Sequence, residues 1–388
     1  MILLLVSGLA FGLLILTWVV YPLVMWLRSR HAPESSAALN VAHDRVWVVI
    51  ATRDHPSAAI TRIQNIYQTS YPASLLRVVV AVDRKSPFRV EEYREVLGDS
   101  ADVVQGNAPG GKASNLNAGA RLALDSGADV LVFADVGQEF NAAAIPQMVA
   151  SLGDSRFGGV AGRYTQQRID SVMAAYAGFE AVIRAGQARH HSVVSTSGSI
   201  YAIRAALWRS LPDGLICDDL FTTLSVVRQG FRVGFNADAV AYYPRTFTKD
   251  EQFARRVRTL TGLIQYITLE RWVLRPWSNP IWIHFVMHKV LRLLTPVPLA
   301  IGGAALVAWL FIEAPRPSLI VAAALSVITI GFALVARRTF RRVVDQLAWL
   351  IRLQLVPGLA IANGLRGRWT VWTPTPQKNT GASAGVEV

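Results

Sequence analysis

The sequence predicts an α/β domain with a mostly parallel sheet, flanked by transmembrane helices on its N-terminal and C-terminal sides. Three short runs, at 45–51, 76–82 and 130–134, are continuously apolar, and helical patterns at 60–68 and 113–126 separate them. Continuous apolar strands that alternate with helices are typical of a parallel sheet covered on both faces. Long uncharged blocks near both ends of the chain add membrane spans to this domain.

The composition supports a membrane protein with a soluble part. Of the 388 residues, 52% are hydrophobic and only 17% are charged, and the mean hydropathy is +0.33. The net charge is +13, but Lys and Arg stand next to apolar blocks, which favours anionic lipid headgroups over nucleic acid as the partner. The single cysteine, Cys217, excludes an intramolecular disulfide and a multi-cysteine metal site.

The apolar blocks divide the chain into six segments. Residues 2–27 carry no charge and are long enough to span a bilayer, and Arg28 and Arg30 follow them, so the next segment should be cytoplasmic. A secretory signal is the rival interpretation, but this apolar run is too long for one. We expect an N-terminal anchor at 1–30, the α/β domain at 44–248, basic interfacial helices at 249–292, two transmembrane helices at 293–336, an interfacial or re-entrant helix with a C-terminal segment at 337–378, and a disordered tail at 379–388.

A pair of adjacent carboxylates marks the candidate catalytic position. Asp218 and Asp219 follow a turn signal at 212–214 and begin a helical pattern that ends at Gly230. Crowding of two like charges drives their pKa values apart, so one of them can act as a general base near neutral pH. The pair taken alone fits an acidic helix start without chemistry somewhat better. Two further carboxylates, Asp83 and Asp135, directly follow the second and third strands, where such a fold holds a nucleotide.

Taken together, these segments resemble the membrane-anchored family-2 glycosyltransferases of the GT-A fold, a Rossmann-like group that includes the hyaluronan, cellulose and chitin synthases. The resemblance runs from the first strand to about Gln377 and rests on several motifs in a fixed order. Residues 51–56 are similar to the nucleotide-binding opening of the family, which implies that Thr52 and Asp54 contact the nucleotide. Asp83 matches the carboxylate that receives the uracil ring, because a carboxylate can accept its imide N–H.

The glycine-rich segment at 110–119 is similar to an element that faces the diphosphate of the donor. It implies roles for Lys112 and Asn117 in nucleotide-sugar binding, although an ordinary helix start explains the segment about as well. Asp135 matches the first acid of the Asp-x-Asp motif and implies a contact to Mg²⁺ or Mn²⁺. Gly137 stands in place of the second acid, so either Glu139 or Asp83 would compensate for it or the ion would be held mostly by the diphosphate.

The remaining motifs imply an acceptor site and a catalytic base. The segment at 196–204 is similar to the acceptor-side element, in which Ser197 and Gly198 would line the pocket. By the same resemblance Asp219 is the general base, with Asp218 in place of a glutamate. Arg258 would neutralise charge on the leaving diphosphate, with Arg255 in place of a glutamine of the processive synthases. Thr259 replaces their acceptor-stacking tryptophan, and the C-terminal motif around Trp372 lacks its arginine.

The resemblance implies inverting transfer from a nucleotide sugar, UDP-linked, to a saccharide or lipid-linked acceptor at the cytoplasmic face of the inner membrane. This activity would serve polysaccharide or glycolipid biosynthesis. One alternative is a single transfer to polyprenyl phosphate, which the lost stacking residue favours. Another is a non-catalytic membrane protein that only binds nucleotide, which the change at Gly137 motivates. Sugar specificity would depend on the surroundings of Arg163, Tyr164, Glu180 and Arg184.

Overall fold

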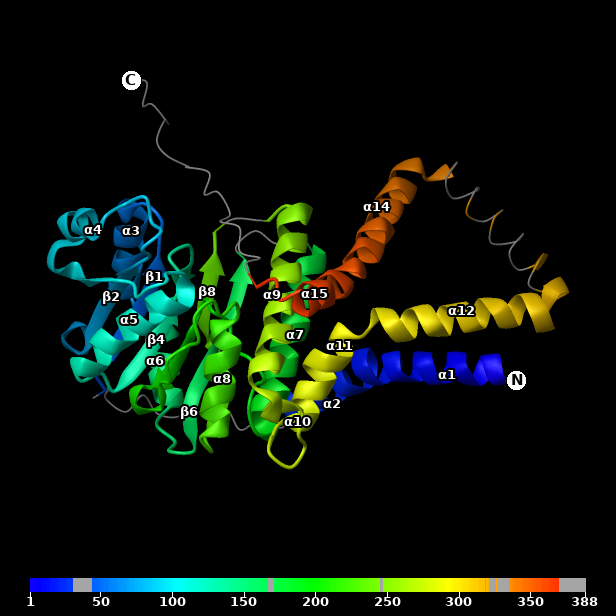
Figure 1. Ribbon diagram of the computed structural model, residues 1–388, viewed down its shortest axis with the longest axis horizontal. Helices are drawn as coiled ribbons and strands as arrows, with labels where there is room; N and C mark the ends of the chain where they lie inside the picture. The colour runs from blue at the N-terminus through cyan, green and yellow to red at the C-terminus, as the bar shows by residue number, and fades with distance from the viewer. Residues whose placement is uncertain are drawn as a thin grey trace, which may run out of the picture.

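The computed structural model describes residues 1–30, 44–166, 171–244, 247–317, 319–320, 326, 329 and 335–369. A sheet covered by helices forms one end of the molecule, and two long helices, α1 and α12, project side by side from the other end (Figure 1). The predicted C-terminal motif around Trp372, the tail at 379–388 and most of the predicted span at 318–336 lie outside the described residues.

The described sheet has eight strands in the order β3-β2-β1-β4-β7-β6-β8-β5. Strands β3, β2, β1 and β4 are parallel to one another, and β6 pairs in parallel with β8. Strand β7 runs antiparallel to both β4 and β6, and β5 runs antiparallel to β8. The strands are β1 Val46–Thr52, β2 Leu76–Val82, β3 Asp102–Gln105, β4 Val130–Ala134, β5 Glu139–Phe140, β6 Phe157–Gln166, β7 Tyr201–Arg204 and β8 Arg232–Tyr243.

The predicted strands at 76–82 and 130–134 coincide with β2 and β4, and the strand at 45–51 agrees with β1 to within one residue. The sheet is mixed, with four parallel pairings among the described strands and three antiparallel pairings that the sequence did not predict. Strand β7 is only four residues long and reverses direction between β4 and β6. Apolar patterning reports burial and carries no information on strand direction, so the sequence could not reveal this reversal.

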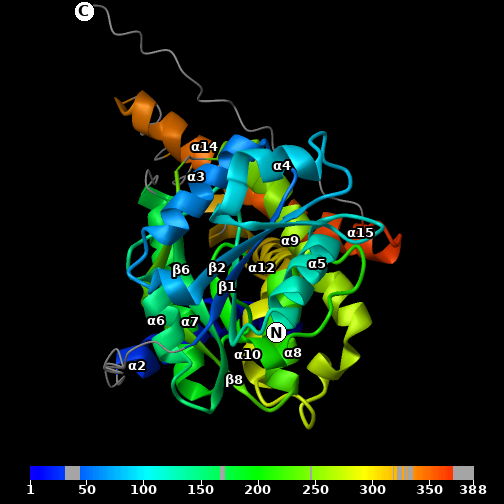
Figure 2. The ribbon, with the colours of Figure 1, turned by 90° about the vertical axis from the view of Figure 1, so that its left-hand side faces the viewer.

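Helices cover both faces of the sheet because successive strand residues point to opposite sides. Trp47 and Val49 of β1 belong to the core beneath α5, α8 and α9, whereas Val48 and Ile50 belong to the core beneath α3, α4 and α6. Figure 2 shows α3 and α6 on one side of the strands and α5 and α8 on the other. The helices of this domain are α3 Pro56–Tyr67, α4 Val90–Leu97, α5 Lys112–Asp125, α6 Ala144–Ser151, α7 Ser171–His190, α8 Asp218–Arg228 and α9 Lys249–Leu269.

Three helical stretches of the described chain are long and apolar enough to cross a membrane by length and composition: Ile2–Arg30, Pro296–Glu313 and Arg337–Leu365. The first comprises α1 Ile2–Ile15, the π-helical turn η1 Leu16–Val20 and α2 Tyr21–Arg30, and the second is α12. The third consists of α14 Arg337–Leu353 and α15 Leu355–Leu365, and it is the segment for which the sequence predicts an interfacial helix. Helix α15 packs against α9, where Asn363 Nδ2 donates to Thr261 Oγ1 at 3.3 Å.

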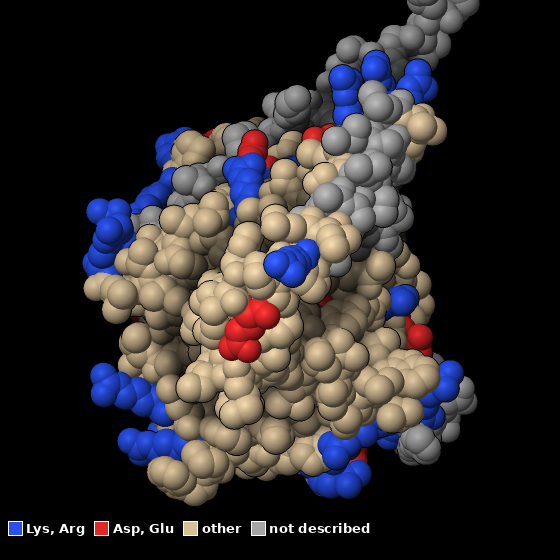
Figure 3. Space-filling view, turned by 90° about the vertical axis from the view of Figure 1, so that its right-hand side faces the viewer, with Lys and Arg blue, Asp and Glu red and all other residues tan. Residues whose placement is uncertain are grey.

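Four short helical segments connect α9 of the α/β domain to the projecting helix α12. They are η5 Arg271–Leu274, α10 Trp282–Phe285, η6 Val286–Val290 and α11 Leu291–Leu293. Seen from the end at which α1 and α12 project, the middle of the surface is largely uncharged and Lys and Arg gather around its rim (Figure 3). This distribution is typical of a surface that meets a bilayer, where cations stay at the headgroup level.

Candidate functional site

Lys112 joins the two halves of the candidate site. It is the first residue of α5, and its Nζ lies 2.9 Å from Asp135 Oδ1 and 3.3 Å from Asp218 Oδ2. Asp135 follows β4 and Asp218 begins α8, so residues far apart in sequence meet at one edge of the sheet. The Asp218 side chain is only 7% exposed, whereas Lys112 and Asp135 are each 34% exposed. The site is therefore open on the Asp135 side and closed around Asp218.

The ammonium group of Lys112 contacts both Asp135 and Asp218, and these contacts shift the pKa values of Lys112 and Asp218. Burial alone would lower the pKa of Lys112, but Asp135 and Asp218 raise it above its ordinary value. Burial raises the pKa of Asp218 to about 6, and the neighbouring charges of Asp219 and Asp135 add to this while Lys112 opposes it. Lys112 thus stays protonated, and Asp218 is the carboxylate that binds a proton most readily.

Asp219 is more accessible than its neighbour, which suits a group that receives a proton from substrate. Its Oδ1 accepts from the backbone N–H of Leu220 at 2.9 Å, and its carbonyl oxygen accepts from Thr223 Oγ1 at 2.6 Å. Thr196 Oγ1 also donates to this carbonyl oxygen at 3.4 Å, which ties the acceptor-side segment to the start of α8. The backbone of Asp219 is therefore fixed, while one carboxylate oxygen has no described protein donor.

Asp83 lies at the end of β2 and is held by several donors. Its Oδ2 accepts from the backbone N–H of Gly111 at 3.0 Å and from Arg53 Nη2 at 3.4 Å, and its Oδ1 accepts from the N–H of Lys85 at 2.8 Å. Gly110 has a positive φ of 87°, and a Cβ on it would lie 3.0 Å from Asp83 Oδ1. The glycines of this segment therefore allow the backbone to pass close to the carboxylate.

The end of β1 contributes Thr52 and Asp54 beside Asp83. Thr52 Oγ1 accepts from the backbone N–H of Asp54 at 3.0 Å, and the N–H of Asp83 donates to the carbonyl of Thr52 at 2.8 Å. Burial raises the pKa of Asp54, and the charge of Asp135 raises it further while Arg53 opposes both effects. Residues predicted from three separate motifs thus share one strand edge with Asp135 and Lys112.

The side-chain amide of Asn117 is hydrogen-bonded elsewhere and is not free at this edge. Its Nδ2 donates to the carbonyl of Leu211 at 2.9 Å, and its Oδ1 accepts from the N–H of Leu211 at 2.8 Å. This reciprocal pair fixes the loop that leads to the acidic pair, so Asn117 holds the position of α8. Its predicted contact to the donor would require these two bonds to break.

The acceptor-side residues lie against the same lysine. A Cβ on Gly198 would lie 3.2 Å from Lys112 Nζ and 4.0 Å from Asp218 Oδ2, so Gly198 borders the charged group directly. Ser197 pairs with Ile200 in a tight turn that leads into β7. A side chain at position 198 would therefore press on the ammonium group of Lys112.

The two predicted arginines of α9 occupy different surroundings. The charge of Arg258 acts on Cys217, the residue before the acidic pair, although burial is the main reason that the pKa of this thiol is raised. Arg255 instead stacks over Phe247, with Cζ 4.1 Å from the ring centroid, and lies 6.0 Å from the ring of Tyr243. Arg258 therefore lies near the catalytic pair, whereas Arg255 faces an aromatic group at the end of β8.

Tyr243 is a residue that the motif comparison missed. Its hydroxyl lies 3.7 Å from the position that a Cβ on Gly137 would take, where the family carries its second acid. The aromatic doublet Tyr242–Tyr243 at a strand end is the sequence signal that could have found it. Lys289, which the sequence places only in a basic interfacial stretch, lies in η6 and donates from its Nζ to Ser195 Oγ at 2.8 Å, two residues before Ser197.

The described residues contain no group of three or more His, Cys, Asp or Glu side chains that could hold a metal ion by themselves. Asp135 and Asp218 both contact Lys112 Nζ, and for the buried Asp218 Oδ2 this ion pair at 3.3 Å is the one partner that the described residues supply. Magnesium is commonly bound through one or two carboxylates together with substrate phosphates. The residues present fit an ion of that kind, which depends on the diphosphate for most of its ligands.

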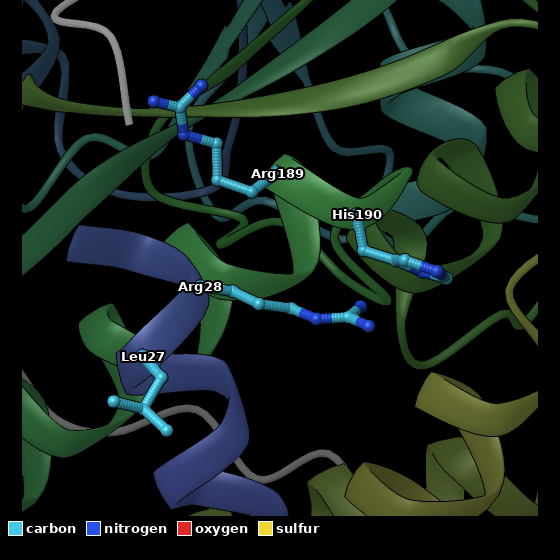
Figure 4. A pocket seen from close by; sticks show the side chains of 4 residues that line it. All are labelled: Leu27, Arg28, Arg189 and His190. Carbon is cyan, nitrogen blue, oxygen red and sulfur yellow. The ribbon is translucent and has the colours of Figure 1, made fainter. Parts of the chain in front are cut away.

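A cavity of about 550 Å³ lies away from this site, between α2 and α7. It is lined by Leu27, Arg28, Arg189 and His190 (Figure 4). Arg28 and His190 extend in one direction, while Arg189 turns away from them. None of the residues predicted to bind donor or acceptor lines this cavity.

Comparison with known proteins agrees with the fold. The model of the family described as glycosyltransferase like family 2 matches residues 43–270, more than half of the chain. A mannosyltransferase from Pyrobaculum calidifontis, solved in complex with GDP-Man and Mn²⁺, is similar with a TM-score of 0.66 at 20% identity, covering 94% of this chain and 99% of that chain.

A second solved structure is similar over a smaller part of the chain. Glucosyl-3-phosphoglycerate synthase from Mycobacterium tuberculosis, in complex with Mn²⁺, UDP and glucosyl-3-phosphoglycerate, has a TM-score of 0.41 at 17% identity, covering 61% of this chain and 85% of that chain. No curated protein matches the sequence. The family match spans β1 to α9, which includes Asp135, Lys112 and the acidic pair. The chain therefore belongs to glycosyltransferase family 2, and its catalytic domain has a GT-A-like α/β fold.

Proposed function

We propose that this protein is an inverting glycosyltransferase that moves a sugar from a UDP-linked donor to a saccharide or lipid-linked acceptor at the cytoplasmic face of the membrane. The observation that carries this proposal is the contact of Lys112 with both Asp135 and Asp218. It brings a cation for the diphosphate, a carboxylate for a metal ion and the start of the catalytic helix to one point. Membership of the family supplies the reaction class.

In this proposal the donor lies along the carboxyl ends of β1, β2 and β4. Asp83 would accept the imide N–H of uracil, and Thr52 and Asp54 would line the nucleoside. Lys112 would contact the diphosphate once the donor competes for its ammonium group. Asp135 would hold Mg²⁺ or Mn²⁺ against the diphosphate, and the ion would neutralise the charge that develops on the leaving group.

The acceptor would enter beside Ser197 and Gly198, of which Gly198 borders Lys112. Its hydroxyl oxygen forms the new bond to the anomeric carbon while the bond from that carbon to the donor diphosphate breaks. Asp219 takes the hydroxyl proton, and Arg258 and Lys112 face the departing UDP. Attack from the side opposite to the leaving group inverts the configuration, and no covalent intermediate is required.

The substitution Asp219→Asn tests the assignment of the base. The amide keeps the shape and the bond from Leu220 N–H but cannot take a proton, so we expect UDP binding to persist and transfer to fall by at least about 100-fold, within the range that general-base catalysis contributes. Binding would be measured by calorimetry with UDP, and transfer by product formation from a labelled donor. Asp238→Asn, at an exposed position, is the matched control and should retain full activity. Transfer at the wild-type rate by Asp219→Asn would remove Asp219 from the mechanism.

A release screen separates the enzyme from a non-catalytic nucleotide-binding protein. UDP- and GDP-sugars would be incubated with the purified full chain, with and without Mn²⁺, and nucleotide release would be followed. Binding without release from any donor would contradict the enzymatic proposal. Product length then decides between the two kinds of transfer, since a ladder indicates polymerisation and a single lipid-linked sugar indicates one-step transfer.

A further inference from the structure

Three cationic side chains gather between α7 and the segment that leads into α12. Lys289 belongs to η6, Arg292 to α11, and Arg184 to α7. Glu180, one turn before Arg184, accepts from Arg292 Nη1 at 2.5 Å and contacts His288 Nε2 at 3.0 Å. We call Arg184, Lys289 and Arg292 the junction cations, because they lie where the catalytic domain meets the projecting helices (Figure 1).

The charges of this group do not balance. Burial, against the opposing effect of Glu180, lowers the pKa of His288 to about 4, so its imidazole is neutral near pH 7. Burial alone would raise the pKa of Glu180, but His288, Arg292 and Arg184 lower it well below its ordinary value. Glu180 is the carboxylate in direct contact with this group, through Arg292, and the three junction cations carry more positive charge than it neutralises. A surplus of positive charge of this kind suits a phosphate group.

Several guanidinium donors of the junction cations have no partner. Arg184 Nε and Arg292 Nε and Nη2 are buried without a hydrogen-bond acceptor among the described residues, and the Arg292 side chain is only 10% exposed. A buried donor that lacks an acceptor costs roughly 1–3 kcal/mol. These N–H groups are therefore available to an anionic ligand, which would recover that cost.

The neighbouring polar side chains, in contrast, are fully engaged with one another. Gln187 Nε2 contacts His288 Nδ1 at 2.9 Å and donates to Tyr21 Oη at 2.8 Å, and Gln187 Oε1 accepts from Val194 N–H at 3.3 Å. Tyr21 Oη in turn contacts His284 Nδ1 at 3.0 Å. Because these neighbouring groups have partners, the unpaired donors of the two arginines are a local property of the junction.

The junction cations lie beside the candidate membrane spans. Arg292 Cζ lies 4.7 Å from the ring centroid of Trp18 and 5.3 Å from that of Phe179. Trp18 belongs to the span Ile2–Arg30, and its Nε1 donates to Thr295 Oγ1 at 2.9 Å, directly before α12. A ligand at Arg292 would therefore have its apolar part next to two membrane helices.

The junction cations also lie beside the catalytic residues. Lys289 Nζ donates to Ser195 Oγ at 2.8 Å, and Thr196, the next residue, contacts the backbone of Asp219. The same segment reaches Gly198, which borders Lys112 at the donor side. Three residues of chain reach at most about 10 Å. Ser195, which Lys289 contacts, therefore lies within about 10 Å of Gly198, so an anion at Lys289 would lie close to both Asp219 and the donor side.

We propose that the junction cations bind the phosphate of a lipid-linked acceptor, which fixes the acceptor with its hydroxyl toward Asp219 and its hydrocarbon chain along Trp18. The proposal rests on the proposed function, since it names the acceptor class of the same site. The phosphate is an anchor and takes no part in bond formation. Its oxygens would accept from the unpaired N–H groups of Arg184 and Arg292. We assign the phosphate to a lipid because Arg292 lies against Trp18 of a candidate membrane span.

The test measures binding of farnesyl phosphate to the purified full chain in detergent, with farnesol and inorganic phosphate as the comparison ligands. We expect farnesyl phosphate to bind at least about 10-fold more tightly than either one. Lys289→Met and Arg292→Met keep the length of the side chain and remove its charge, so each should weaken that binding at least about 10-fold while calorimetric UDP binding stays unchanged. Arg121→Met, at an exposed position of α5, is the matched control.

The binding measurements test the proposed phosphate site independently of the enzymatic function. Equal binding of farnesol and farnesyl phosphate would show that the phosphate is not recognised, and binding of inorganic phosphate as tight as that of farnesyl phosphate would exclude the lipid source. Either result overturns the proposal even if UDP binding and sugar transfer are intact. If a methionine variant does not fold, Arg292→Lys and Lys289→Arg keep the charge and should retain binding of farnesyl phosphate, and loss of that binding in a folded protein of either kind would contradict the proposal. Absence of UDP binding in the wild type would instead contradict the proposed function.

Discussion

The buried carboxylate of Asp218 should destabilise the folded protein at neutral pH, and Asp218→Asn should relieve this cost. Burial and the neighbouring acids raise its pKa to about 6, so the folded state binds a proton more tightly than the unfolded state does. The substitution removes the charge at nearly constant shape. Lys112 keeps its contact of 2.9 Å with Asp135 and is not left as an unpaired buried cation.

The magnitude follows from linkage between proton binding and folding. For a carboxylate with a raised pKa, stability is lost as the pH rises from the unfolded pKa to the folded pKa and stays low above it. A pKa difference of about 2 corresponds to about 3 kcal/mol at 25 °C. The full cost applies above about pH 6, and roughly half of it applies at pH 5. For a domain of this size, 1 kcal/mol shifts Tm by roughly 2–4 °C, so the expected gain at pH 7.5 is roughly 6–12 °C.

Thermal unfolding of the full chain in detergent, without added metal, would measure this effect. The Tm of Asp218→Asn minus that of the wild type should be positive at pH 7.5 and should shrink by about half at pH 5. Asp99→Asn, at an exposed carboxylate, is the control and should leave Tm unchanged at both pH values. A lower Tm for Asp218→Asn at pH 7.5 would refute the reasoning, because it would mean that the attraction of Lys112 outweighs the burial of Asp218.

Two glycine positions give further predictions. Gly137→Asp places a carboxylate where the new Cβ meets only Tyr243, at an ordinary contact distance of 3.7 Å, so it should fold and lower the Mn²⁺ concentration for half-maximal activity, whereas Gly137→Ala should not. An unchanged metal requirement would argue against an ion at this position. Gly186→Ala should destabilise the protein by about 1–3 kcal/mol in thermal unfolding, because its Cβ would lie 2.2 Å from the carbonyl oxygen of Met25. Gly178→Ala on the same helix meets nothing within 4 Å and is the control, so equal Tm values for the two variants would contradict the close packing of α7 on α2.

Much of the catalytic domain could be predicted from the sequence because its central strands are buried on both faces. The apolar runs that became β1, β2 and β4 and the helical patterns that became α3 and α5 are dictated by this burial. The later elements were harder to predict. Helix α7 contacts both the sheet and helix α2. Because it is buried on two sides, its apolar residues do not form the single stripe at helical spacing by which an amphipathic helix is predicted.

The candidate site also contains some residues whose positions could be predicted from the sequence and others whose positions could not. Asp83 and Asp135 could be located because each directly follows a parallel strand, where the topology of such sheets collects functional groups. The engagement of Asn117 with Leu211 could not be foreseen, because a motif gives the type of a residue and leaves its partner open. Tyr243 lies beside Gly137 and Lys289 contacts Ser195, and both come from elements whose packing depends on contacts across the whole molecule.

The sequence by itself determined that this is an α/β domain with apolar helices at its ends and which acids follow its strands, because local patterning and burial are written in the order of residues. Only the tertiary structure decided that the sheet is mixed, that one lysine contacts both Asp135 and Asp218, and that Lys289 contacts Ser195 beside the start of α8. These features depend on which segments meet in space, and the free energy of such long-range contacts leaves little signal in any one stretch of chain.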